Sequence, residues 1–133
     1  MAGRKRTDRD GVQPGARSPR SRVRRIGFVG FRHALALDIV GPMEAFSLAA
    51  ETGPGRAPRY RCLLLGLNRR PFVTESGLVI RPDCTLSEAP ALDTLVIPGG
   101  AGLRDPKVNE RIATWLRASA GRMRRIASVC TGI

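Results

Sequence analysis

The sequence is poor in the residues that form disulfides and metal sites. Its 133 residues include one histidine, His33, and three cysteines, Cys62, Cys84 and Cys130. An odd number of cysteines without regular spacing excludes a disulfide framework and is typical of a reducing cytosol. No Cys or His cluster has metal-ligand spacing, so we expect neither a metal nor another cofactor. The lone histidine is typical of a surface residue and provides no Cys/His pair.

Long apolar runs are absent as well. No segment approaches the ~18 consecutive apolar residues of a membrane span, so we expect no membrane partner. The stretch "RRIGFVGF" follows a basic segment and has the outline of an export signal, but Asp38 and Glu44 interrupt the apolar region. The sequence therefore predicts a cytoplasmic protein.

Acidic and apolar residues are scarce at the start of the chain. Residues 1–25 carry nine basic and two acidic residues, and thus +7 of the net charge of +12. Such a segment cannot offset its ordering entropy by burial. We expect a disordered basic arm over residues 1–23, which either binds phosphate backbones nonspecifically or acts only as a solubilising extension.

The remaining chain, residues 24–133, alternates between short apolar runs and helical periodicity. This order predicts an α/β fold with a largely parallel, doubly wound sheet, in which ligands sit beyond the carboxyl ends of the strands. In the first helix, Val40, Met43, Phe46 and Ala50 are expected to share the buried face. We predict strands at 25–31, 59–67, 92–100 and 124–130, a hairpin at 71–80 turning at 75–77, and helices at 37–51 and 106–121.

Cys130 follows the last predicted strand in the stretch "VCTG". Small residues after the cysteine suggest a sharp turn into a helix, which is a nucleophile elbow in outline. The N-terminus of such a helix would favour the reactive thiolate. The alternative is a buried structural cysteine, which is also what we expect for Cys62 and Cys84.

Two further candidates follow other predicted strands. Asp38 comes after the first strand, where its carboxylate can either cap a helix or exchange a proton with a nearby thiol. Gly100 lies in "IPGGAG", residues 97–102. The N–H groups of this stretch either face an oxyanion or only form a tight turn.

Taken together, "LDIVGPMEAF", "TESGLVIRPDCTLSEAPALDTLVIPGG" and "RRIASVCTG" resemble the ThiJ/PfpI superfamily, which has the class I glutamine amidotransferase-like, flavodoxin-like fold. The resemblance is to the sensor half of GlxA-like transcriptional regulators of the AraC type, and it covers residues 24–133. It implies that Cys130 is the elbow cysteine, Asp38 the acidic residue that contacts it, and Gly100 the turn glycine of the oxyanion pocket.

The resemblance also implies a function and its alternatives. A regulator of this type senses an unknown small-molecule effector, commonly dimerises, and binds DNA through a C-terminal domain that this chain lacks. The chain stops three residues after Cys130, so we expect a truncated domain without the helix of the elbow. The alternatives are a small ThiJ/PfpI-type enzyme, such as an isocyanide hydratase or glyoxalase-like protein with Cys130 as nucleophile and Asp38 as its acid/base partner, or a nonfunctional fragment. Catalysis is left open, with the sensor preferred.

Overall fold

The computed structural model describes residues 23–50 and 59–132. Almost all of the predicted basic arm therefore lies outside the described residues. The described part contains a five-stranded sheet with the order β5-β2-β1-β6-β7, in which every neighbouring pair is parallel. Its strands are β1 (Arg24–Gly30), β2 (Tyr60–Gly66), β5 (Cys84–Thr85), β6 (Thr94–Ile97) and β7 (Arg125–Ser128).

Strand β1 lies at the centre of the sheet and carries much of the core. It pairs along its whole length with β2 and, from Ile26 to Phe28, with β6. Because both faces of a central parallel strand are covered, its side chains must be apolar. Phe28 and Val29 are accordingly fully buried, as are Leu65 on β2 and Leu95 on β6.

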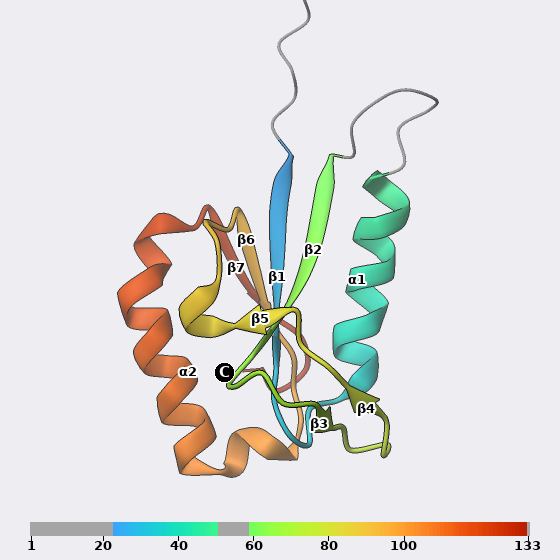
Figure 1. Cartoon of the computed structure of the whole chain (residues 1–133), viewed down its shortest axis with the longest axis vertical. Helices are drawn as coiled ribbons and strands as arrows, with labels where there is room; N and C mark the ends of the chain where they lie inside the picture. The colour runs from blue at the N-terminus through green and yellow to red at the C-terminus, as the bar shows by residue number, and fades with distance from the viewer. Residues whose placement is uncertain (1–22, 51–58, 133) are drawn as a thin grey trace, which may run out of the picture.

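Helices α1 (Ala36–Ala50) and α2 (Pro106–Ser119) lie on opposite sides of the sheet (Figure 1). The chain leaves the centre in one direction from β1 to β2 and in the other from β6 to β7. Because parallel crossovers are right-handed, the two helices are placed on different faces. The predicted fold class, a doubly wound and largely parallel sheet of the flavodoxin-like type, is confirmed.

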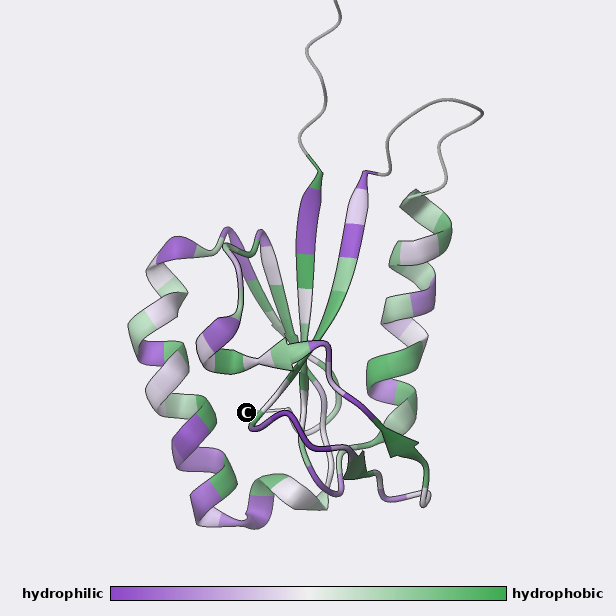
Figure 2. Cartoon of the chain, in the orientation of Figure 1, coloured by the Kyte–Doolittle hydropathy of each residue, from purple (hydrophilic) through white to green (hydrophobic). Residues whose placement is uncertain are grey.

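Helix α1 differs from its prediction in the face that it buries. Met43 and Phe46 pack against the core and Ala50 is buried, as predicted, but Val40 is 42% exposed and Ile39 takes the buried position. Figure 2 shows hydrophobic residues on several sides of this helix. Since apolar residues surround the helix, periodicity alone does not select its inner face.

Helix α2 agrees with its prediction because it has a single apolar stripe. Its first residue is Pro106, and the Asp105 carboxylate accepts a hydrogen bond from the Lys107 amide at 2.9 Å, which caps the helix. Ile112 is fully buried. The other members of this stripe, Val108, Trp115 and Leu116, pack against the core. A short 3-10 turn, η3 (Ala120–Arg122), follows the helix.

The predicted hairpin is confirmed as a small antiparallel pair outside the main sheet, β3 (Phe72–Val73) and β4 (Val79–Ile80). Its turn is closed at one end by the Thr74 amide, which donates to the Leu78 carbonyl at 2.9 Å. No prediction covered strand β5, which pairs with the end of β2.

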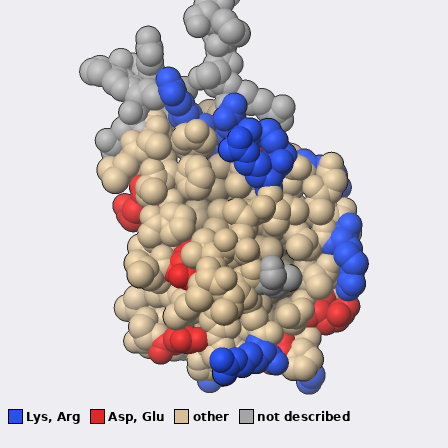
Figure 3. All heavy atoms as spheres, turned by 180° about the vertical axis from the view of Figure 1, so that it is seen from behind, with Lys and Arg blue, Asp and Glu red and all other residues tan. Residues whose placement is uncertain are grey.

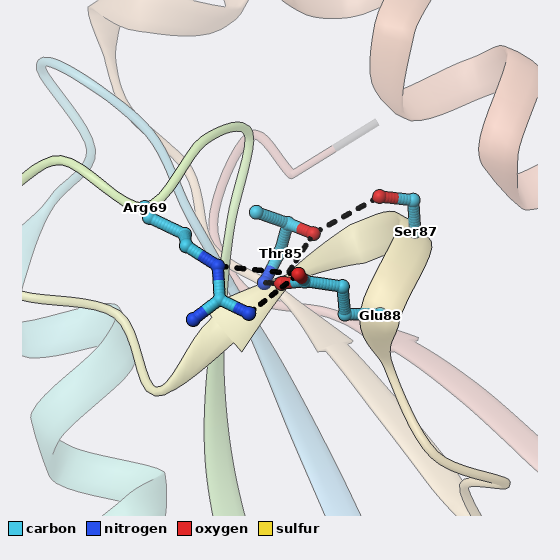
Figure 4. A network of polar contacts seen from close by, with 4 residues as sticks. All are labelled: Arg69, Thr85, Ser87 and Glu88. Atoms are coloured by element: carbon cyan, nitrogen blue, oxygen red, sulfur yellow. Dashed lines mark hydrogen bonds and ion pairs between the residues drawn. The ribbon is translucent and has the colours of Figure 1, made fainter.

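The turn that follows β5 is held by a small polar network (Figure 4). This turn is the 3-10 helix η1 (Leu86–Glu88). The Glu88 carboxylate accepts hydrogen bonds from the amide and the hydroxyl of Thr85, and it pairs with Arg69 at 2.5 Å. Arg69 holds the pKa of Glu88 at about 2, with a further contribution from Thr85. The pairing connects the loop after β2 to the edge of the sheet.

Strand β7 forms the edge of the sheet opposite β5, and all four of its residues are exposed. An apolar groove with a volume of about 650 Å³ runs beside it on the side of α1, between Phe46 of the helix and Ile126 of the strand. Within the described residues, none of the helices has the length and apolar character needed to cross a membrane.

Candidate functional site

The candidate residues meet at the carboxyl ends of β1, β6 and β7. The chain turns in opposite directions from β1 and β6, so the strand order reverses between these two neighbours. Loops that follow such a pair diverge and leave a crevice, which is where ligands bind in open α/β sheets. Asp38, Gly100 and Cys130 each belong to one of the segments that border this crevice.

Cys130 lies two residues beyond the end of β7, in a turn with an unusual backbone. Its φ is 56°, in the left-handed region that residues with a Cβ rarely occupy. The Gly132 amide donates to the Val129 carbonyl at 3.0 Å across the same turn. The cysteine is exposed, so it is not the buried structural cysteine of the alternative interpretation. A strained, exposed residue at a strand end is one feature of a nucleophile elbow.

Asp38 lies in the first turn of α1, but it does not cap that helix. Its carboxylate accepts a hydrogen bond from the Gly99 amide at 3.0 Å. This contact joins the helix after β1 to the turn after β6, across 61 positions of the sequence. Placing a carboxylate near the positive end of the helix is also favourable. Asp38 therefore positions the glycine turn.

The two glycines of that turn are required by close packing. A Cβ on Gly99 would lie 2.9 Å from the amide and hydroxyl of Thr131 and 3.0 Å from the Cβ of Cys130. Gly100 has a φ of 135°, and a Cβ there would overlap the carbonyl oxygen of His33. The missing side chains allow the turn to lie between the loop after β1 and the loop that carries Cys130.

Three successive amides of the turn donate to side chains of the protein itself. Besides the Gly99 amide, the Gly100 amide donates to the Thr131 hydroxyl at a long 3.4 Å, and the Ala101 amide donates to the Glu75 carboxylate at 2.5 Å. An oxyanion hole needs such donors to point at the reacting group. Here the amides of Gly99 and Ala101 already donate to Asp38 and Glu75. The predicted oxyanion role of Gly100 therefore receives no support from the amides on either side of it.

Glu75 and Thr131 are two site residues that sequence reasoning did not identify. Glu75 lies at the tip of the hairpin, whose position over the site is fixed by two bonds, from the Glu75 amide to the Ala34 carbonyl at 3.1 Å and from the His33 amide to the Val73 carbonyl at 2.8 Å. The only available signal was an acidic residue in a hairpin turn. Thr131 follows Cys130 directly and could have been named with it.

The crevice is an open groove with a volume of about 450 Å³. Its lining contains one acidic residue, Glu75, and one basic residue, Arg104, which ends the 3-10 helix η2 (Ala101–Arg104). Apolar side chains, one amide, one thiol and one hydroxyl complete the lining. The residues around the groove are Leu35, Glu75, Gly100, Ala101, Leu103, Arg104, Asn109, Cys130 and Thr131.

The other predicted candidates lie apart from the groove. His33 is exposed and does not line it, although the carbonyl of His33 accepts the Gly102 amide at 3.2 Å. Burial raises the pKa of the Cys62 and Cys84 thiols, as expected for structural cysteines. No three His, Cys, Asp or Glu side chains of the described residues are grouped as a metal site would require.

The doubly wound sheet, with a groove at the carboxyl ends of its central strands, defines a class of α/β proteins of the flavodoxin-like type. A family model described as the DJ-1/PfpI family matches residues 24–133. The chain belongs to this family. Among solved structures, a ThiJ/PfpI family protein from Pseudomonas syringae superposes with a TM-score of 0.68 at 20% identity, covering 92% of this chain and 51% of that one. This likeness supports the fold.

Of two curated relatives, one is named as a transcriptional regulator and the other as an enzyme. The HTH-type transcriptional regulator GbdR of Pseudomonas aeruginosa is 34% identical over 122 residues, which are 92% of this chain and 31% of the regulator. The isonitrile hydratase of Pseudomonas putida is 30% identical over 107 residues, which are 80% of this chain and 43% of the hydratase. The chain thus spans less than half the length of either relative.

Proposed function

We propose that this chain is the ligand-sensing part of a GlxA-like transcriptional regulator of the AraC type, and that the groove beside Cys130 holds a small polar effector. The observation that carries this proposal is the use of the turn amides by Asp38 and Glu75. A site whose backbone donors are already bonded can enclose a ligand, but it lacks the free donors that stabilise a developing oxyanion. The regulator relative, matched over 92% of this chain, supports the same function.

The charges of the groove suggest the chemistry of the effector. Glu75 and Arg104 line the same groove, so a molecule that carries both charges can pair with both side chains. The proposal also includes dimerisation and DNA binding through a further domain, both of which the resemblance implies.

The second candidate is an enzyme that adds water to an isonitrile carbon and releases an N-substituted formamide, with Cys130 as nucleophile and Asp38 as acid/base partner. The left-handed backbone and the exposure of Cys130 favour it. In this candidate, one carboxylate oxygen of Asp38 accepts the Gly99 amide, and the other would exchange a proton with the Cys130 thiol.

One pair of assays on the full chain and on Cys130→Ser separates the candidates. Free amino acids, which carry both charges, serve as probes in a thermal unfolding screen, and an alkyl isonitrile is tested for formamide formation by NMR. In a sensor, a ligand at about 100 times its Kd raises the free energy of unfolding by about 2.7 kcal/mol. The increase is expected in both proteins, because binding does not require the thiol. Formamide formation that is lost in Cys130→Ser would contradict the sensor and support the hydratase.

A further inference from the structure

A second groove lies at the opposite edge of the sheet, where the strands begin, and arginines dominate its lining. Its volume is about 650 Å³. The arginines come from β1, from the residue before β2, and from the segment between α2 and β7, so the parallel sheet brings together residues that are far apart in the sequence. The five arginines are Arg24, Arg25, Arg59, Arg122 and Arg124. We call the groove that they line the arginine groove.

The side chains of the groove are far from electrically balanced. Its lining contains one acidic residue, Asp93, against five arginines, a net charge of +4. Asp93 accepts two hydrogen bonds from Arg124, at 2.8 and 2.9 Å, and so neutralises that arginine. Figure 3 shows Lys and Arg gathered at this end of the molecule.

Part of this charge has a structural explanation. Helices α1 and α2 both end at this edge of the sheet (Figure 1), and each C-terminus carries roughly half a negative charge. Two helix ends therefore account for about one positive charge of the four. About three remain without a counterpart among the described residues, which is more than the fold requires.

We propose that the arginine groove binds the phosphodiester backbone of a nucleic acid. Arginine presents a planar fork of donors that matches phosphate oxygens, and all five cations of the groove are arginines. The chain that precedes β1 is also positively charged, because residues 1–22 contain seven basic and two acidic residues. The α/β domain itself thus contributes to polyanion binding, in addition to any contribution of residues 1–22.

An anionic membrane fits the groove less well than a nucleic acid. Surfaces that bind lipid combine basic residues with exposed apolar side chains that enter the bilayer. In the arginine groove the large apolar side chains are not exposed: Leu92 is only 8% exposed, and Val23 and Tyr60 are half-buried. The exposed large hydrophobic residues of the described chain, such as Leu37, Leu48 and Val79, lie outside its lining. This inference concerns a different surface from the proposed effector site and stands independently of it.

The test compares two triple variants of the full chain that lose the same charge. The groove variant is Arg24→Gln, Arg25→Gln and Arg59→Gln, and the control is Arg70→Gln, Arg81→Gln and Lys107→Gln. All six side chains are exposed, and the ion pairs among the described residues use other arginines. A third variant with lysine at the three groove positions keeps the charge. Urea unfolding of each variant verifies that it folds.

Binding of a fluorescent short DNA duplex is measured by anisotropy between about 50 and 200 mM salt. We expect the groove variant to lose about tenfold or more in affinity at low salt, and its salt slope to fall by roughly 2 to 3, because three phosphate contacts disappear. The control should lose little, and the lysine variant should retain most of the binding. Equal losses in the groove and control variants would show an effect of net charge alone and overturn the proposal.

Two other results would also overturn it. Unchanged DNA binding by a folded groove variant would place the affinity outside the groove. Tighter binding to phosphatidylserine vesicles than to DNA, with the same dependence on the three arginines, would assign the surface to a membrane instead.

Discussion

Gly100 shows at the scale of a single residue how closely the site is packed. Its φ of 135° and ψ of 158° lie in a region that is essentially restricted to glycine. The carbonyl of His33 and the backbone of Ala34 lie where a Cβ would project. The turn after β6 can therefore approach the loop after β1 only because position 100 has no side chain.

We predict that Gly100→Ala lowers the free energy of unfolding by at least about 2 kcal/mol, since the backbone strain and the overlap act together. Gly121→Ala is the matched control, because nothing lies within 4 Å of its Cβ position and its φ is outside the left-handed region. That substitution should be neutral or stabilise by up to about 1 kcal/mol. Urea unfolding measures both, and equal effects of the two substitutions would contradict the packing of the turn.

Cys130 is, with His33, one of two non-glycine residues of the described chain with a left-handed φ, and its position separates two roles that the sequence left open. A structural cysteine would be buried in a relaxed strand, whereas this one is exposed at a φ of 56°. Strain of this kind persists only where surrounding contacts maintain it. Here those contacts are the glycine turn at Gly99 and the bond that closes the turn at Gly132.

At the scale of elements, Asp93 joins the beginnings of β6 and β7. Its amide donates to the Arg25 carbonyl, its carbonyl accepts the amides of Arg124 and Arg125, and its carboxylate pairs with the Arg124 side chain. Arg124 is the main cause that holds the pKa of Asp93 at about 2, and Thr94 contributes as well. One residue thus positions two strands that are about 30 residues apart in the sequence.

The lowered pKa predicts the pH dependence of stability. Because the folded pKa of Asp93 lies below the unfolded value of about 3.9, its stabilising contribution is present above about pH 4 and is lost as the pH falls towards 2. Asp93→Asn should lower the free energy of unfolding by about 1 kcal/mol at pH 7, because the pair is partly exposed, and by progressively less towards pH 2.

Urea unfolding at a series of pH values checks this, with Glu110→Gln as the control. Glu110 pairs with Arg117 on the exposed surface of α2 and joins no two strands, so we expect a smaller effect at pH 7. A destabilisation by Asp93→Asn that persists unchanged at pH 2 would mean that the carboxylate charge is not its cause.

The elements differ in how far the sequence specifies them. Helix α2 was predictable because Pro106 marks its start and one apolar stripe marks its inner face. The inner face of α1 was not predictable, since Val40 and Ile39 are both apolar. Only packing against the sheet decides that Ile39 is buried and Val40 exposed. Strand β5 was missed because two residues, Cys84 and Thr85, are too few to show a pattern.

For the whole molecule, chain order was sufficient to predict the doubly wound sheet and the edge at which Asp38, Gly100 and Cys130 meet. It was not sufficient to predict the bonds between them. The acceptors of the turn amides come from α1, from the hairpin and from the residue after Cys130, and no local pattern indicates that the hairpin tip reaches Ala101. The arginine groove was hidden in the same way, because its residues come from separate strand beginnings.

The protein's own carboxylates occupy two backbone donors of the site, and amide hydrogen exchange at Gly99 and Ala101 tests this most directly. We predict slow exchange at both positions in the full chain. Asp38→Ala should speed exchange at Gly99 and leave Ala101 protected, while Glu75→Ala should do the reverse, because each carboxylate accepts only one of the two amides. Exchange at both amides as fast as in an unstructured chain, or exchange that neither substitution changes, would contradict the account.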